Sequence, residues 1–66
     1  MKLNKLKGKL VECNMSYEDC AKELGISKTA FSNKMQGNSN FTVEEAKNLS
    51  DVLHLNTNEK EDIFLS

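Results

Sequence analysis

Apolar residues at the start of the chain recur at the spacing of a helix. They are three, four and three positions apart and form one stripe on a helical wheel, made of Leu3, Leu6, Leu10 and Cys13. Gly8 interrupts this segment at a cost of about 1 kcal/mol relative to alanine. The stretch "NMS" at residues 14–16 then ends the pattern, so the sequence predicts a first helix within residues 3–13.

Two further helices are bounded by residues that favour helix ends. Ser16 is a good N-cap, and Gly25 can end a second helix in the left-handed conformation. Ser27 caps a third helix after a very short connection, and Gly37 closes it. Their apolar residues are Cys20, Ala21 and Leu24 in the second helix, and Ala30, Phe31 and Met35 in the third.

The last third of the chain predicts two more helices. Thr42 and Glu45 have the spacing of a capping box and open a fourth helix, which "HLN" at residues 54–56 ends. Either Asn56 or Thr57 caps a short fifth helix that continues to residue 66. The pattern is all-α, with five short helices and no convincing strand. The expected shared core contains the N-terminal leucines and Phe31, Met35, Phe41, Leu49 and Leu53.

The composition narrows the class of protein. A chain of 66 residues is one domain, 1–66, with no room for an enclosed substrate cavity beside a core, which argues against an enzyme with catalytic residues. Cys13 and Cys20 are the only cysteines and are expected in the core, while the single His54 is far from both. We therefore predict no metal and no cofactor. The lysine-rich N-terminus lacks a continuous apolar run, which favours a cytoplasmic protein without a membrane partner.

The net charge of −1 is unevenly distributed along the chain. Residues 1–36 carry seven lysines and four acids, 7 − 4 = +3, whereas residues 37–66 carry two lysines and six acids, 2 − 6 = −4. If the fold keeps these halves apart, a weakly basic surface faces one way and an acidic surface the other.

Four positions in the second and third helices have the spacing of a helix-turn-helix. Ala21 is small enough for a close helix crossing, and Gly25 accepts the tight turn. Ile26 places an apolar side chain at the turn, and Phe31 anchors the next helix. With these positions buried, the outward residues of the third helix are Lys28, Thr29, Ser32, Asn33 and Gln36.

This outward set suits the major groove of DNA. Asparagine and glutamine can bond adenine in a bidentate manner, lysine favours guanine, and the threonine methyl group can contact thymine. In the docking geometry of a helix-turn-helix, the N-terminal turn points toward the base edges, so Lys28 and Thr29 would lie deepest.

The segment "MSYEDCAKELGISKTAFSNKMQGNSNFTVEEAKNLSDVL" resembles the Cro and repressor helix-turn-helix family of phages and bacteria, especially its short phage-encoded members. The resemblance implies a compact five-helix, lambda-repressor-like domain in which helices 2 and 3 form the motif. It also implies base contacts from Lys28, Thr29, Ser32 and Asn33, and phosphate contacts from Tyr17, Asn38 and Ser39. One position departs from the family pattern: Lys34 stands where an aliphatic residue is usual, with Met35 next to it.

Two functional hypotheses follow. The first is a sequence-specific transcriptional regulator, Cro- or repressor-like, that binds double-stranded DNA as a homodimer and has no small-molecule substrate. The second is a protein-interaction module of the same fold, antirepressor- or antitoxin-like, which the absence of arginine favours.

The expected dimer surface lies near the C-terminus. Leu55, Ile63, Phe64 and Leu65 cluster there, and so short a helix is not expected to bury all of them in one small core. The alternative is that Phe64 closes the core of the monomer.

Overall fold

The computed structural model describes residues 1–65, and these residues form five α-helices and no strand. The prediction of an all-helical chain with five helices is therefore confirmed for this part of the chain; the predicted end of the fifth helix at residue 66 lies outside it. The helices are α1 (Leu3–Glu12), α2 (Tyr17–Leu24), α3 (Lys28–Met35), α4 (Val43–Val52) and α5 (Thr57–Phe64).

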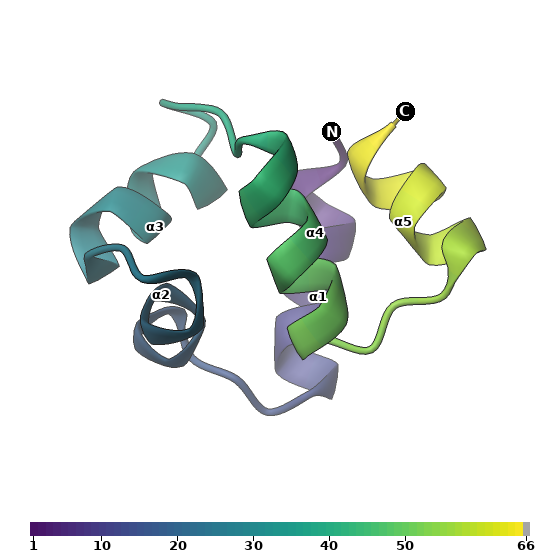
Figure 1. Cartoon of the computed structure of the whole chain (residues 1–66), viewed down its shortest axis with the longest axis horizontal. Helices are drawn as coiled ribbons and strands as arrows, with labels where there is room; N and C mark the ends of the chain where they lie inside the picture. The colour runs from purple at the N-terminus through teal and green to yellow at the C-terminus, as the bar shows by residue number, and fades with distance from the viewer. Residues whose placement is uncertain (66) are drawn as a thin grey trace.

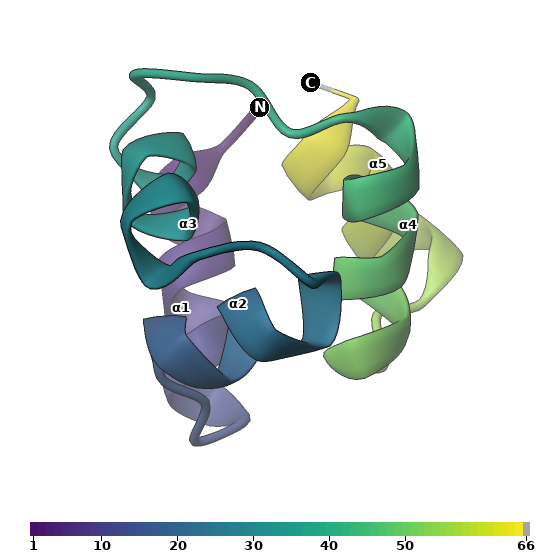
Figure 2. The same ribbon diagram turned by 60° about the vertical axis from the view of Figure 1, so that its left-hand side comes forward.

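The helices are arranged around α4. Figure 1 shows α2 and α3 on one side of α4 and α5 on the other, with α1 behind it. α2 packs closely on α3 and also contacts α4, whereas α1 packs on α5. Figure 2 brings the α2–α3 pair forward and shows the long loop that leads from α3 to α4. The two chain ends lie at the same end of the molecule, where the Lys2 amide donates a hydrogen bond of 2.8 Å to the Ile63 carbonyl.

Side-chain caps begin four of these helices at the positions that the sequence indicated. In each case the side-chain oxygen accepts a hydrogen bond from the backbone amide three residues later, which satisfies a donor at the start of the helix. Asn56 rather than Thr57 caps α5, so that alternative is resolved. The capping residues are Ser16, Ser27, Thr42 and Asn56.

Four helices end at a residue with left-handed backbone geometry. Gly25, at φ +71°, and Gly37, at φ +84°, take this role as predicted. Asn14 and His54 take it as well, at φ +57° and +55°, although neither is a glycine. At each end, the amide of the following residue bonds the carbonyl five positions earlier, which is the Schellman motif. The helix breaks at "NMS" and "HLN" thus have a backbone cause that the sequence analysis did not identify.

Phe31 lies at the centre of the core. Its side chain is fully buried and meets Tyr17 and Phe41 in edge-to-face contacts, with ring centroids 5.4 Å and 5.7 Å away. Such geometry stabilises an aromatic pair beyond its burial alone. Phe41 and Tyr17 are only partly buried. Leu3, one of the predicted N-terminal leucines, is also only partly buried. The rest of the predicted core is confirmed, and the buried apolar side chains are Leu6, Leu10, Cys20, Ala21, Phe31, Met35, Leu49, Leu53, Leu55 and Ile63.

One expectation about burial was wrong, whereas the expectation that the C-terminal apolar cluster is not buried as a whole is confirmed. Cys13 is exposed rather than in the core, because it follows the last residue of α1, where its thiol donates a weak hydrogen bond of 3.7 Å to the Leu53 carbonyl. Leu55 and Ile63 are buried in the monomer, at 7% and 3% exposure, because α5 packs along α1. Of the predicted C-terminal cluster, only Leu65 remains largely exposed, at 80%.

Candidate functional site

The corner between α2 and α3 is built as the sequence indicated. The side chain of Ala21 is buried, and Gly25 takes the positive φ that the turn requires. The Ile26 amide donates to the Ala21 carbonyl at 3.0 Å, and the Ile26 side chain packs against the core. Phe31, on the inner face of α3, is fully buried. Backbone bonds and side-chain packing therefore both fix the angle between the two helices.

The face of α3 away from Phe31 is polar and mostly exposed. Lys28, Thr29 and Asn33 are exposed, and none of their side chains is bonded within the described part of the chain. Ser32 is half-buried, and its hydroxyl oxygen accepts a hydrogen bond of 3.1 Å from the side-chain amide (Nε2) of Gln36. Three of the four predicted base-contacting side chains are thus open to a ligand, while the fourth is partly occupied.

The start of α3 carries a positive electrostatic character. α2, α4 and α5 each have acidic residues in the first turn, whereas α3 has none and begins with Lys28. Its Ser27 cap is neutral and accepts only the Ala30 amide, at 3.0 Å. Since the N-terminus of a helix bears a partial positive charge, this end of α3 favours an anionic partner.

The loop after α3 carries two of the predicted phosphate contacts, Asn38 and Ser39, and both are exposed. The Asn38 amide donates to the Asn33 carbonyl at 2.9 Å, and its side chain donates to Gln36 at 3.3 Å. Gln36 therefore links Ser32 on the helix to Asn38 in the loop. Sequence reasoning placed Gln36 on the outward face as a candidate for the groove but did not predict this link, although its spacing of four from Ser32 is the signal for such a pair.

Tyr17, the third predicted phosphate contact, begins α2. Its ring is half-buried against Phe31, which fixes the side chain at the base of the α2–α3 pair. Its hydroxyl has no hydrogen bond to any residue between 1 and 65. The hydroxyl is therefore available as a donor at the start of α2.

Lysines at the start of the chain lie against acids of α5, so the fold does not keep the basic and acidic halves of the sequence apart. Lys2 and Lys5 both pair with Asp62, the first at 2.9 Å. Lys9 pairs with Glu59 and lies 3.6 Å from Glu12. The fold brings the two ends of the sequence together, so opposite charges neutralise each other locally.

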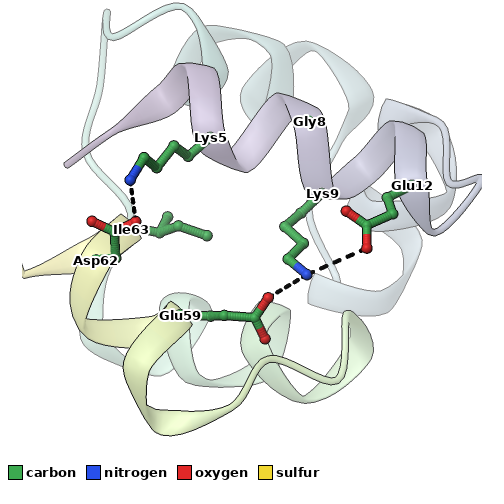
Figure 3. A pocket seen from close by; sticks show the side chains of 7 residues that line it. All are labelled: Lys5, Gly8, Lys9, Glu12, Glu59, Asp62 and Ile63. Atoms are coloured by element: carbon green, nitrogen blue, oxygen red, sulfur yellow. Dashed lines mark hydrogen bonds and ion pairs between the residues drawn. The ribbon is translucent and has the colours of Figure 1, made fainter.

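These ion pairs border a groove of about 280 Å³ between α1 and α5. Figure 3 shows Lys5 reaching Asp62 at one end of the groove and Lys9 reaching Glu59 further along it. The hydrogen bond to Lys9 lowers the pKa of Glu59, and the bonds from Lys5 and Lys2 lower the pKa of Asp62. Because each charge in the groove already faces its opposite, the groove offers little to a ligand of one charge.

The surface formed by α2 and α3 also has few lysines that are free to bind an anion. Lys34 pairs with Glu45 at 3.0 Å, whereas Lys22 and Lys28 are exposed without an ion pair to the described residues. Recognition by this face would depend mainly on neutral hydrogen-bonding groups.

Other chemistry is limited in the described residues. Burial raises the pKa of the Cys20 thiol to about 11, so Cys20 is an unreactive core residue. No three histidine, cysteine, aspartate or glutamate side chains among residues 1–65 are grouped so that they could hold a metal ion. No helix in this part of the chain is both long and apolar enough to cross a membrane.

Comparisons of the chain with protein-family models, with curated proteins and with solved structures found no significant match.

Proposed function

We propose that α2 and α3 form a helix-turn-helix and that the protein is a sequence-specific, Cro- or repressor-like regulator of transcription with a lambda-repressor-like fold. The observation that supports this most is the face of α3. Lys28, Thr29 and Asn33 are exposed and unbonded to other described residues, on a helix whose other face is anchored by Phe31 and Met35. A rigid helix with free hydrogen-bonding groups is what reading base edges requires.

In this proposal α3 enters the major groove with its N-terminal turn first. The Asn33 amide bonds adenine, the Thr29 methyl group contacts thymine, and Lys28 bonds guanine or a nearby phosphate. Ser32 contributes through its hydroxyl hydrogen, since its oxygen already accepts from Gln36. Tyr17, Asn38 and Ser39 bond phosphates and set the position of α3, but they carry no sequence information.

Selection of bound sequences from a random DNA pool tests this function directly. Thr29→Ala and Asn33→Ala should each cost about 1–3 kcal/mol at particular base pairs and relax the preference there. Their melting temperatures should stay close to that of the parent, because both side chains are exposed. Thr57→Ala and Asn48→Ala are matched controls, since they remove exposed side chains of the same kind from α5 and α4. Unchanged base preference in both α3 variants would contradict the proposed readout.

A homodimer on a palindromic site is part of the same proposal. One short recognition helix reaches only a few base pairs, so two copies on half-sites about 34 Å apart would supply the affinity. The remaining candidate surface is the exposed Leu65, directly after α5. Sedimentation with and without operator DNA should show two copies per duplex. Leu65→Ser should weaken that assembly. Val11→Ser is the control and should leave the assembly unchanged, because Val11 is equally exposed but lies near the end of α1.

The alternative function is a protein-interaction module without DNA binding. The pairing of the α1 lysines with α5 favours it, because the protein then presents few free cations to phosphates. Binding to a random duplex at low salt separates the two functions. A DNA-binding protein associates with any duplex under these conditions through phosphate contacts, whereas the interaction module does not.

A further inference from the structure

The loop between α3 and α4, residues 36–42, is held by Lys34. The Lys34 side chain is only 14% exposed, and its ammonium group donates to the Asn40 carbonyl at 2.9 Å. It also donates to Glu45 Oε1 at 3.0 Å and lies 5.9 Å from the centre of the Phe41 ring. Lys34 thus lies inward and binds the inner side of the loop. The resembled family usually has an aliphatic residue at this position.

Glu45 completes this arrangement. The same Oε1 atom that accepts from Lys34 accepts from the Thr42 amide at 2.8 Å, as part of the cap of α4. The bond from the Thr42 amide and the nearby Lys34 ammonium lower the pKa of Glu45, so it is charged at neutral pH. One carboxylate oxygen therefore joins α3, the end of the loop and the start of α4.

The beginning of the loop is fixed by different bonds. Gly37 has positive φ, and the Asn38 amide donates to the Asn33 carbonyl at 2.9 Å. Between the two fixed ends, the amides of Ser39, Asn40 and Phe41 donate no hydrogen bond within residues 1–65. The loop consequently presents the exposed Asn38 and Ser39 side chains together with three successive unbonded amides.

We propose that Lys34 is a positioning residue that acts through Glu45 and Asn40 to hold this loop in the shape that binds a DNA phosphate. The inference rests on the proposed DNA-binding function and adds to it a role for a buried cation that does not itself reach DNA. Successive backbone amides in a loop form an anion-binding concavity that needs no positive side chain. By binding a phosphate, such a loop would hold one end of α3 on the DNA, although the protein surface around α2 and α3 has few free lysines.

The decisive experiment uses Glu45→Gln and its exposed neighbour Glu44→Gln as the matched control, with affinity for one operator duplex measured over a range of salt concentrations. Removing a negative charge should by itself tighten DNA binding, which is the result expected for the control. Glu45→Gln should instead weaken binding, by about threefold to tenfold, because the neutral amide holds Lys34 less firmly. Tighter binding by Glu45→Gln, as in the control, would overturn the proposal, since Glu45 would then act only as one more negative charge and not through Lys34.

A double-mutant cycle between Lys34 and Asn38 gives a second test that leaves the Glu45 side chain unchanged. Lys34→Met keeps the apolar stem of the side chain against Phe41 but loses both hydrogen bonds, and it should weaken binding about tenfold. Adding Asn38→Ala should then cost clearly less than Asn38→Ala costs in the parent, because the loop is already displaced. Lys34→Arg, which keeps the charge and the donors, should restore most of the affinity. Independent, multiplicative effects of Lys34→Met and Asn38→Ala would refute the positioning role.

The outcomes also separate this inference from the function on which it rests. If the parent protein binds no duplex at low salt, the proposed function and the inference both fail. If the parent binds and the variants of Lys34, Asn38 and Glu45 behave as independent surface changes, only the inference fails. Thermal melts of each variant identify any loss of binding that comes from unfolding.

Discussion

Replacing Gly8 by alanine should stabilise the protein. Gly8 lies within α1, and an added Cβ atom would meet no other atom within 4 Å, so the substitution neither clashes nor creates a new contact. The change in free energy is then the difference in helix propensity, about 1 kcal/mol in favour of alanine. For a domain of this size, that corresponds to an increase in melting temperature of roughly 4–8 °C.

Gly25→Ala is the matched control for this prediction. The Cβ atom at residue 25 would also meet nothing within 4 Å, but φ there is +71°. Alanine in the left-handed region costs about 1–2 kcal/mol, offset by about 0.4–1 kcal/mol from the stiffer unfolded chain. Gly25→Ala should therefore lose roughly 1 kcal/mol while Gly8→Ala gains the same amount.

Thermal and urea unfolding, followed by circular dichroism, measure both variants. The urea m-value should remain that of the parent, because neither change alters the surface that unfolding exposes. A lower melting temperature for Gly8→Ala would refute the reasoning, and would indicate that another backbone approaches α1 at this point. Dependence of that loss on protein concentration would identify a second copy of the chain as the partner.

Three further outcomes follow from the same structure. Ala21→Leu should cost about 1–3 kcal/mol and lose DNA binding in parallel, since Ala21 is buried where α2 packs on α3; an unchanged melt would contradict that packing. His54→Gly should gain about 0.5–1 kcal/mol, because φ is +55° at this residue; denaturant titration would test the sign. Hydrogen bonds from Lys5 and Lys2 hold the pKa of Asp62 below 3.8, so their stabilisation is complete above about pH 4 and is lost as the pH falls through the lowered pKa. Asp62→Asn should flatten the acid limb of a plot of melting temperature against pH, and a plot unchanged from the parent would show that the pairs do not stabilise α5.

The limits of the helices were predictable because their causes are local. Ser16, Ser27 and Thr42 each bond an amide three residues away, and Gly25 and Gly37 supply positive φ within a single residue. Such interactions need no distant partner, so a short stretch of sequence contains all the information. The same holds for much of the candidate DNA-reading face, since helical spacing alone placed Thr29 and Asn33 opposite Phe31, while Lys28 lies in the first turn of the helix.

Some local information was nevertheless missed. Asn14 and His54 end α1 and α4 in the same left-handed conformation as the glycines. Asparagine is the non-glycine residue that most often tolerates this geometry, so Asn14 was within reach of the sequence. Histidine is also enriched at positive φ, so His54 was a weaker signal of the same kind, and the residue after it, Leu55, is buried in the core.

Tertiary structure alone decided which charges are free and which apolar residues are covered. Asp62 and Glu59 lie 50 or more positions from the lysines that they neutralise, and only the packing of α5 on α1 brings them together. The same packing buries Ile63, which the sequence left as a candidate dimer contact. Lys34 is the clearest case: the sequence marks it only as a departure from the pattern of the resembled family, and its partners Asn40 and Glu45 become neighbours only when the loop folds back over α3. Caps and turns are determined by neighbours in sequence, whereas ion pairs and burial depend on contacts between distant segments, and these exist only in the folded chain.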